Sequence, residues 1–125
     1  MIRRIALGFA ALAAGAGVLT TASPAHALAG WGGTLTPGSV ACVGQYAGTK
    51  VQGDGTATGD GAKFFIYRSG VLAYATPGRV TGWVQGLTST SVPPFPGAGD
   101  YTVCAKNTGN ANTLVNMHIA TDGEF

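Results

Sequence analysis

The chain after residue 28 contains short runs in which apolar residues alternate with polar or small ones, and no helical pattern of useful length. The clearest runs are residues 39–47, 63–68, 101–106 and 113–121. In the last of these runs, Val115, Met117 and Ile119 alternate with Asn116 and His118, so one face is apolar and the other is polar. Alternation of this kind predicts β-strands that each bury one face.

Turn residues separate the runs and indicate how the strands connect. The expected turns and loops are Ser69-Gly70, Pro77-Gly78, the Gly-, Asp- and Thr-rich residues 53–61, the proline-rich residues 91–99, and residues 107–110. Further strands are expected at residues 71–76 and 79–87. About six or seven strands joined in this way favour an all-β fold, an antiparallel two-sheet β-sandwich, over a parallel sheet.

The first 27 residues have the features of a cleavable signal peptide. Arg3 and Arg4 precede an uncharged apolar stretch, residues 5–20, and Ala25-His26-Ala27 has the small-x-small pattern of a cleavage site. The apolar stretch is shorter than the roughly 20 residues that a membrane-spanning helix needs. We therefore expect residues 28–125 to form one secreted domain that does not insert stably into a membrane. The domain is expected to be extracellular, and in one alternative it is associated with the cell surface.

The charge of the expected mature domain excludes several kinds of partner. Without Arg3 and Arg4, five basic residues remain against five acidic ones, so the net charge is zero. A basic patch for nucleic acid or anionic lipid is therefore not expected. Glycine is abundant, at 21 residues in the whole chain, which favours turns and short strands over helices.

Cys42 and Cys104 are the only cysteines in the chain. In an oxidising, exported location two cysteines predict one intramolecular disulfide. A thiolate metal site would need more Cys or His ligands than the chain offers. A small domain with a modest core gains stability from such a covalent link.

The segment Gly97-Ala98-Gly99-Asp100-Tyr101-Thr102-Val103 resembles the start of a strand in bacterial immunoglobulin-like sandwich modules. The separation of Cys42 and Cys104 is similar to that of the inter-sheet disulfide in immunoglobulin domains. Tyr101 precedes Cys104 by three residues, where the tyrosine corner has two. The resemblance implies a sandwich and no particular activity, because this architecture carries unrelated functions. In composition the chain also resembles the small, Ala- and Gly-rich exported proteins of high-GC Gram-positive bacteria.

Groups for catalysis are sparse. His118 is the only histidine after residue 27, it is expected on the polar face of the last strand, and no nucleophile-elbow sequence accompanies it. The carboxylates lie in turns or near the C-terminus, which does not suggest the paired acids of a glycosidase. Asp54 and Asp60 lie six residues apart, too far for the alternating ligands of a calcium loop. We expect no enzymatic activity, no metal site and no cofactor, and a calcium role for the Asp54/Asp60 loop stays open.

Four residues are candidates for binding a partner. Pro94 and Phe95 lie in the proline-rich loop, and a stiff, extended loop loses little entropy when it is bound. Trp83 would stack on a sugar ring or a side chain if it is exposed, and Tyr101 follows the loop. The alternative is that Phe95 and Trp83 pack in the core.

Three classes of function follow. The first is a non-enzymatic extracellular protein that binds another protein or a polysaccharide, with inhibition of a hydrolase as one version. The second is a structural or cell-surface protein of the envelope, because a low charge density opposes self-association only weakly. The third is a small hydrolase, which the sparse catalytic groups disfavour.

Overall fold

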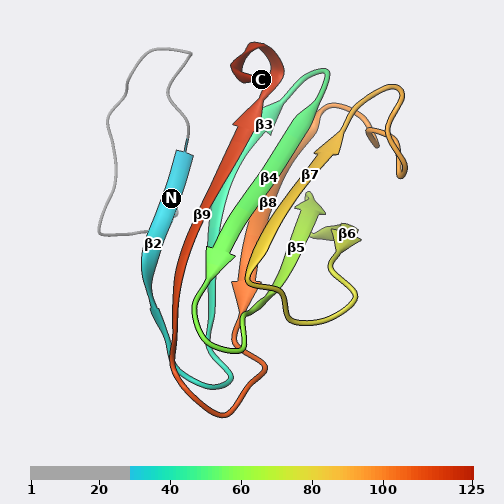
Figure 1. The fold of residues 1–125 in the computed structure, drawn as a ribbon. Coiled ribbons are helices and arrows are strands. Elements are labelled where there is room, and N and C mark those ends of the chain that lie inside the picture. Colours follow the sequence, from blue (N-terminus) through green and yellow to red (C-terminus); the bar gives the residue numbers. More distant parts are fainter. Residues whose placement is uncertain (1–28) are drawn as a thin grey trace.

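The computed structural model describes residues 29–125, and the predicted signal peptide lies outside these residues. The described chain forms eight strands and one short 3-10 helix (Figure 1). The strands are β2 (Ala29–Leu35), β3 (Val40–Ala47), β4 (Val51–Ala57), β5 (Lys63–Arg68), β6 (Val71–Ala75), β7 (Gly82–Leu87), β8 (Gly99–Lys106) and β9 (Thr113–Thr121), and η1 spans Asp122–Glu124. The expectation of an all-β antiparallel sandwich is confirmed, but the number of strands is eight rather than six or seven.

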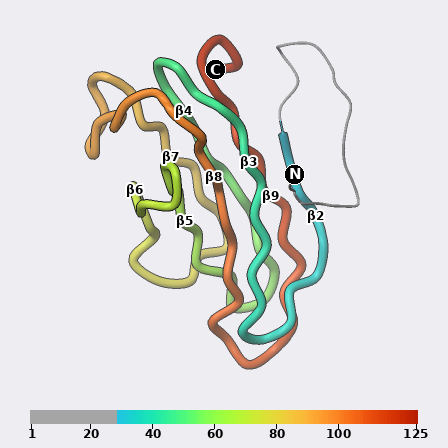
Figure 2. Tube along the Cα trace, turned by 180° about the vertical axis from the view of Figure 1, so that it is seen from behind, coloured from blue at the N-terminus to red at the C-terminus, as the bar shows by residue number. Residues whose placement is uncertain are grey.

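Two antiparallel sheets of four strands pack face to face. Their strand orders are β2-β9-β4-β7 and β3-β8-β5-β6, and Figure 2 shows the second sheet from its own side. The first and last strands pair with each other, and the chain crosses between the sheets at every step except β5 to β6. This order is that of an eight-stranded jelly roll. In an immunoglobulin sandwich the first two strands share a sheet, whereas β2 and β3 lie in opposite sheets.

Two of the eight strands, β2 and β4, were not expected from the sequence. The expected loop at residues 53–61 is wrong for its first half, because Val51–Ala57 is a strand that pairs with both β9 and β7. The glycines of this strand make room for aromatic side chains from other strands. A Cβ on Gly55 would lie 2.5 Å from Phe64 Cε1, and one on Gly53 would lie 2.5 Å from Trp83 Cη2. The two aromatic rings thus occupy the space over the β4 backbone, where ordinary strand side chains would stand.

The core lies between the sheets and consists of alternating residues from each. The largest side chains with no exposed surface are Val51, Phe64, Ile66, Leu87, Tyr101, Val103, Val115, Met117 and Ile119. The predicted alternation of β9 is confirmed, since Val115, Met117 and Ile119 face inward. The hydrophobic burial on both inner faces is what joins the two sheets.

The predicted disulfide between Cys42 and Cys104 is present. It does not join the two sheets, as the resemblance to immunoglobulin domains had implied. Cys42 on β3 and Cys104 on β8 are register partners in neighbouring strands of one sheet, with Cα atoms 4.1 Å apart. The cross-link therefore lies on the outer face of the β3-β8-β5-β6 sheet, and Cys42 is exposed.

Candidate functional site

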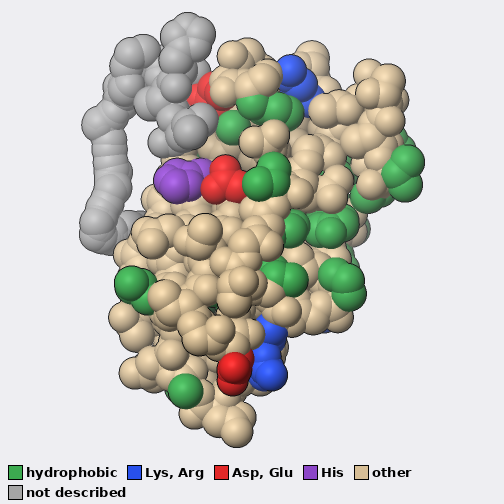
Figure 3. All heavy atoms as spheres, in the orientation of Figure 1, with side chains coloured by type: hydrophobic (Ala, Val, Ile, Leu, Met, Phe, Trp, Pro, Cys, Tyr) green, Lys and Arg blue, Asp and Glu red, His purple; other side chains and the backbone are tan. Residues whose placement is uncertain are grey.

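The outer face of the β2-β9-β4-β7 sheet carries a polar row that runs across its strands. Gly30 is the register partner of His118, His118 of Asp54, and Asp54 of Val84. The Nδ1 atom of His118 lies 3.1 Å from Oδ1 of Asp54, and both side chains are accessible. The space-filling view shows the imidazole and a carboxylate side by side on this face (Figure 3).

A shallow hollow of about 230 Å³ lies beside this pair. It is lined by Asp54, Gly55, Thr56, Gly82, Trp83, Val84, Asn116 and His118. Asn116, Thr56 and Gly82 form the next row across the sheet, one pleat away from the His118–Asp54 row. The hollow thus combines a carboxylate, an imidazole, an amide and a hydroxyl with the apolar side chain of Val84.

Glycines determine the shape of this surface. A Cβ on Gly30 would lie 2.7 Å from Cδ2 of His118, and one on Gly32 would lie 2.6 Å from Oδ1 of Asn116, so both side chains extend over the bare backbone of β2. At Gly82 a Cβ would meet nothing within 4 Å. The absence of a side chain at Gly82 therefore leaves one side of the hollow open at the β7 edge.

Trp83 is only partly accessible and packs against the core from the edge strand β7. Its ring stacks on Phe64 at 5.2 Å and on Tyr74 at 6.2 Å between centroids. The Nε1 atom is buried and has no acceptor within residues 29–125. The residue borders the hollow, but its indole is engaged by core aromatics on the other side of the sheet.

The other three predicted binding residues lie in the loop between β7 and β8 and near the start of β8. Tyr101 has no exposed surface, stacks on Phe95 at 5.4 Å, and donates its hydroxyl hydrogen to the carbonyl of Gly97. Burial raises the pKa of Tyr101 above its ordinary value. Phe95 is half-buried, and its backbone N–H donates to Thr88 O at 2.9 Å. Pro94 is exposed, so of these three only Pro94 lies openly at the surface.

The structure does not bring Pro94, Phe95 and Tyr101 together with Trp83 around one cavity. It brings together Asp54, Thr56, Asn116 and His118 instead. His118 and Asp54 had been weighed only for catalysis and calcium. One feature of the sequence indicates this face: the alternation of β9 predicts that Asn116 and His118 point outward on the same side.

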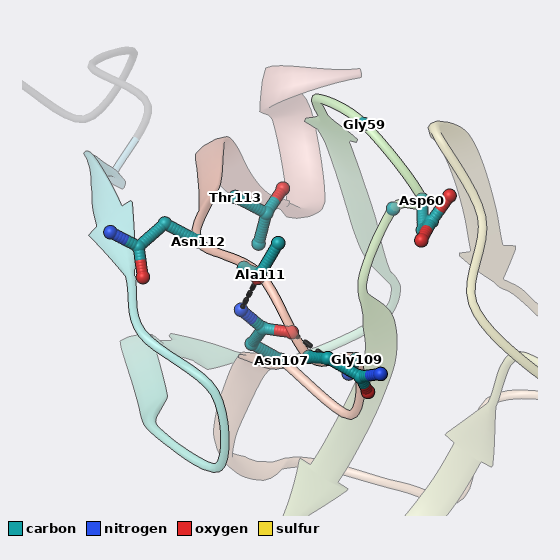
Figure 4. A pocket seen from close by; sticks show the side chains of 9 residues that line it. Gly59, Asp60, Asn107, Gly109, Ala111, Asn112 and Thr113 are labelled. Carbon is teal, nitrogen blue, oxygen red and sulfur yellow. Dashed lines mark hydrogen bonds between the residues drawn. The ribbon is translucent and has the colours of Figure 1, made fainter.

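A second cleft, of about 120 Å³, lies at the end of the sandwich and contains Asp60 (Figure 4). Asn107 in its wall donates to the carbonyls of Leu35 and Ala111, each at 2.8 Å, and accepts from Gly109 N at 2.9 Å. That amide therefore holds the turn together. Asp54 and Asp60 line different clefts, and no cluster of three or more His, Cys, Asp or Glu side chains suited to a metal ion occurs among residues 29–125.

Comparison with known proteins gives no assignment. No protein-family model matches the sequence, and no curated protein matches it significantly. Within the part of the chain that the structure describes, no helix has the length and apolar character to cross a membrane.

Proposed function

We propose that the chain is a secreted, non-enzymatic binding protein, and that it holds a neutral polysaccharide in the hollow on the outer face of the β2-β9-β4-β7 sheet. The observation that carries the proposal is the convergence of Asp54, Thr56, Asn116 and His118 on one shallow, glycine-cleared surface. Sugar hydroxyls both donate and accept hydrogen bonds, and these four side chains supply acceptors and donors within one ring-sized area.

Charge supports a neutral ligand. The expected mature chain has no net charge, and the residues that line the hollow include one carboxylate and no lysine or arginine. An anionic polymer would meet no cation there other than a protonated His118. A neutral sugar ring needs hydrogen bonds and a flat apolar contact, and Val84, 67% exposed, offers the latter beside Asp54.

The alternative of a small hydrolase has one observation in its favour, the His118–Asp54 contact. The lining of the hollow contains neither a serine nor a cysteine, its one hydroxyl group is that of Thr56 in the row beside Asn116, and it contains a single carboxylate. A hydrolytic triad needs a nucleophile beside the histidine, and a glycosidase needs two acids. Binding therefore accounts for these groups better than catalysis does. The other alternative, a structural protein of the cell envelope, differs from the binding proposal because it requires no defined ligand.

The test uses the protein purified from the culture medium after expression of the full chain. It is incubated with insoluble cellulose, chitin, xylan and starch, and the unbound fraction is measured. Gly82→Phe fills the open side of the hollow, because a side chain there meets open space. Gly78→Phe is the matched control, since Gly78 is also free of neighbours and does not line the hollow.

We expect one of the polysaccharides to deplete the parent protein and Gly78→Phe equally. Gly82→Phe should block the open side of the hollow, and Asn116→Ala should remove one hydrogen-bonding group from it. Each variant should bind the polysaccharide at least about tenfold more weakly while keeping the parent's melting temperature. Equal binding by all variants would show that the hollow is not the binding site. No binding to any of the four polymers, or release of soluble sugar that His118→Ala abolishes, would overturn the proposal.

A further inference from the structure

We propose that the outer face of the β3-β8-β5-β6 sheet packs against the same face of a second copy of this chain, related by a two-fold axis that lies in the interface plane, parallel to the sheet and perpendicular to β8. This inference does not depend on the polysaccharide proposal, because it concerns the opposite side of the sandwich. It rests on the side chains of that face and on how its charges are arranged.

The middle of this face is apolar and accessible. One row across the strands holds Cys42, Cys104 and Phe65, and the next holds Thr102, Tyr67 and Leu72. The rings of Phe65 and Tyr67 stack at 5.9 Å, and Leu72 is 53% exposed. The two middle rows on the outer face of the other sheet consist of glycines and polar side chains, with Val84 as their one large apolar side chain. The two faces therefore differ in kind, and only this one resembles the core of a protein interface.

The charges lie at opposite ends of the apolar area. Lys106, an exposed residue, is the register partner of Val40 and Lys63 at one end. Asp100, also exposed, is the partner of Tyr46 at the other end.

Two further cations belong to this face or lie near it, and both are already engaged. Lys63 Nζ lies 5.5 Å from the centroid of the Phe65 ring. Arg68 stands on the other side of its strand and donates to the carbonyls of Gly97 and Ala98. The face therefore carries Lys63 and Lys106 at one end and Asp100 at the other.

A two-fold axis that lies in the interface plane over the middle of β8, and runs perpendicular to that strand, makes this arrangement self-complementary. Lys106 and Asp100 are six residues apart on the same strand, about 20 Å. Turning a second copy by half a turn places its Asp100 opposite Lys106 of the first, and the reverse, while the two apolar areas meet. A closed pair with each residue contacting its counterpart is the usual form of a homodimer.

The size of the face determines how tight the pair can be. Four strands over six residues cover roughly 15 by 20 Å, about 300 Å² per copy and about 600 Å² for the pair, which is below the roughly 1,200 Å² of a standard specific interface. We therefore expect a reversible dimer. In this dimer the polar hollows of the two copies face away from each other, so one dimer would engage two ligand chains or two sites on one chain.

The test is sedimentation velocity of the purified protein without any ligand, over about a hundredfold range of concentration. We expect a concentration-dependent shift from monomer to dimer. Leu72→Asp should raise the dissociation constant at least about tenfold, because it buries an unpaired charge. Leu114→Asp is the matched control: Leu114 is 49% exposed but lies on the other sheet, and it should leave the dissociation constant unchanged.

The charges give a sharper criterion. Asp100→Lys and Lys106→Asp should each weaken the dimer about tenfold, since each places like charges opposite one another. The double variant should regain the parent's dissociation constant. A monomer at every concentration, a dimer that Leu72→Asp leaves intact, or a double variant as weak as the singles would each overturn the proposal. All variants are first shown to keep the parent's circular dichroism and melting temperature.

Discussion

The indole of Trp83 lies directly over the backbone of Gly53, so that a Cβ on this glycine would be 2.5 Å from Cη2 of the ring. Trp83 is on the edge strand β7 and Gly53 is on the neighbouring strand β4, where it pairs with Gln85. The same replacement of a side chain by a neighbour's ring occurs at Gly55 and Phe64. The inner surface of β4 between Val51 and Ala57 is thus filled by side chains from other strands.

This packing makes Gly53 intolerant of substitution. Gly53→Ala should lower the free energy of unfolding by about 1–3 kcal/mol, because the added methyl group displaces the Trp83 ring and Val103 Cγ2, which would be 2.9 Å away. Urea denaturation measures the change. Gly82→Ala is the control, because its Cβ enters open space, and we expect it to alter stability by less than about 0.5 kcal/mol. Equal effects of the two substitutions would contradict this account.

The hydroxyl of Tyr101 gives a second prediction. It donates to the carbonyl of Gly97, four residues earlier, and so closes the end of the proline-rich loop onto β8. Tyr101→Phe keeps the ring on Phe95 but removes this hydrogen bond, and we expect a loss of about 1 kcal/mol in the free energy of unfolding. Tyr46→Phe, at a tyrosine that is 59% exposed, should change nothing measurable. If both variants are as stable as the parent, the hydroxyl does not secure the loop.

Reduction of the disulfide should destabilise the domain strongly. Cys42 and Cys104 are 62 residues apart in sequence, and closing a loop of this length in the unfolded chain is worth about 4 kcal/mol. For a domain of this size we expect the melting temperature to fall by about 15–30 °C. Scanning calorimetry of the reduced protein, and of Cys42→Ser/Cys104→Ser, measures the fall. A reduced protein, verified by thiol titration, that melts with the oxidised one would refute the estimate.

Asp122 should make the protein sensitive to acid. Its carboxylate accepts from the N–H groups of Gly48 and Thr49, at 3.0 and 2.7 Å, and these hydrogen bonds lower its pKa from 3.8 to about 2. Because the folded state holds the proton more weakly than the unfolded state, this contribution to stability is complete above about pH 4. It is lost as the pH falls toward 2.

Asp122→Asn tests this dependence. The variant should be less stable than the parent at neutral pH, because an amide is a weaker acceptor for these N–H groups. Its free energy of unfolding should fall less steeply between about pH 4 and pH 2. Urea denaturation at a series of pH values measures both slopes. Parallel slopes for the two proteins would assign the acid sensitivity to other carboxylates.

The sequence pattern identified the strands in which apolar and polar residues alternate. β5 and β9 have the predicted bounds, and the Ser69-Gly70 turn joins β5 to β6 as expected. β4 was missed because its glycines were interpreted as part of a loop, and no strand had been predicted at β2. Aromatic rings fill the space beside these glycines: Trp31 of β2 itself lies over Gly33, and Trp83 and Phe64, from other strands, lie over β4.

The candidate site shows the same division. The sequence places His118 and Asn116 on one face of a strand, but it does not say which strand lies beside them. Pairing of β9 with β4 brings Asp54, 64 residues away, within 3.1 Å of His118. Aromatic residues had been favoured as binding groups, but in the structure Tyr101 is a core residue, and Trp83 and Phe95 pack against the core.

The sequence by itself determined that the described domain is all-β, that Cys42 pairs with Cys104, and that β9 has one polar face. Residue alternation can be seen within a single segment, and two cysteines allow only one intramolecular pairing. Only the tertiary structure decided the jelly-roll order, the cross-strand position of the disulfide and the meeting of His118 with Asp54. These depend on which strands become neighbours. That choice follows from the joint packing of distant side chains, which no single segment of the sequence contains.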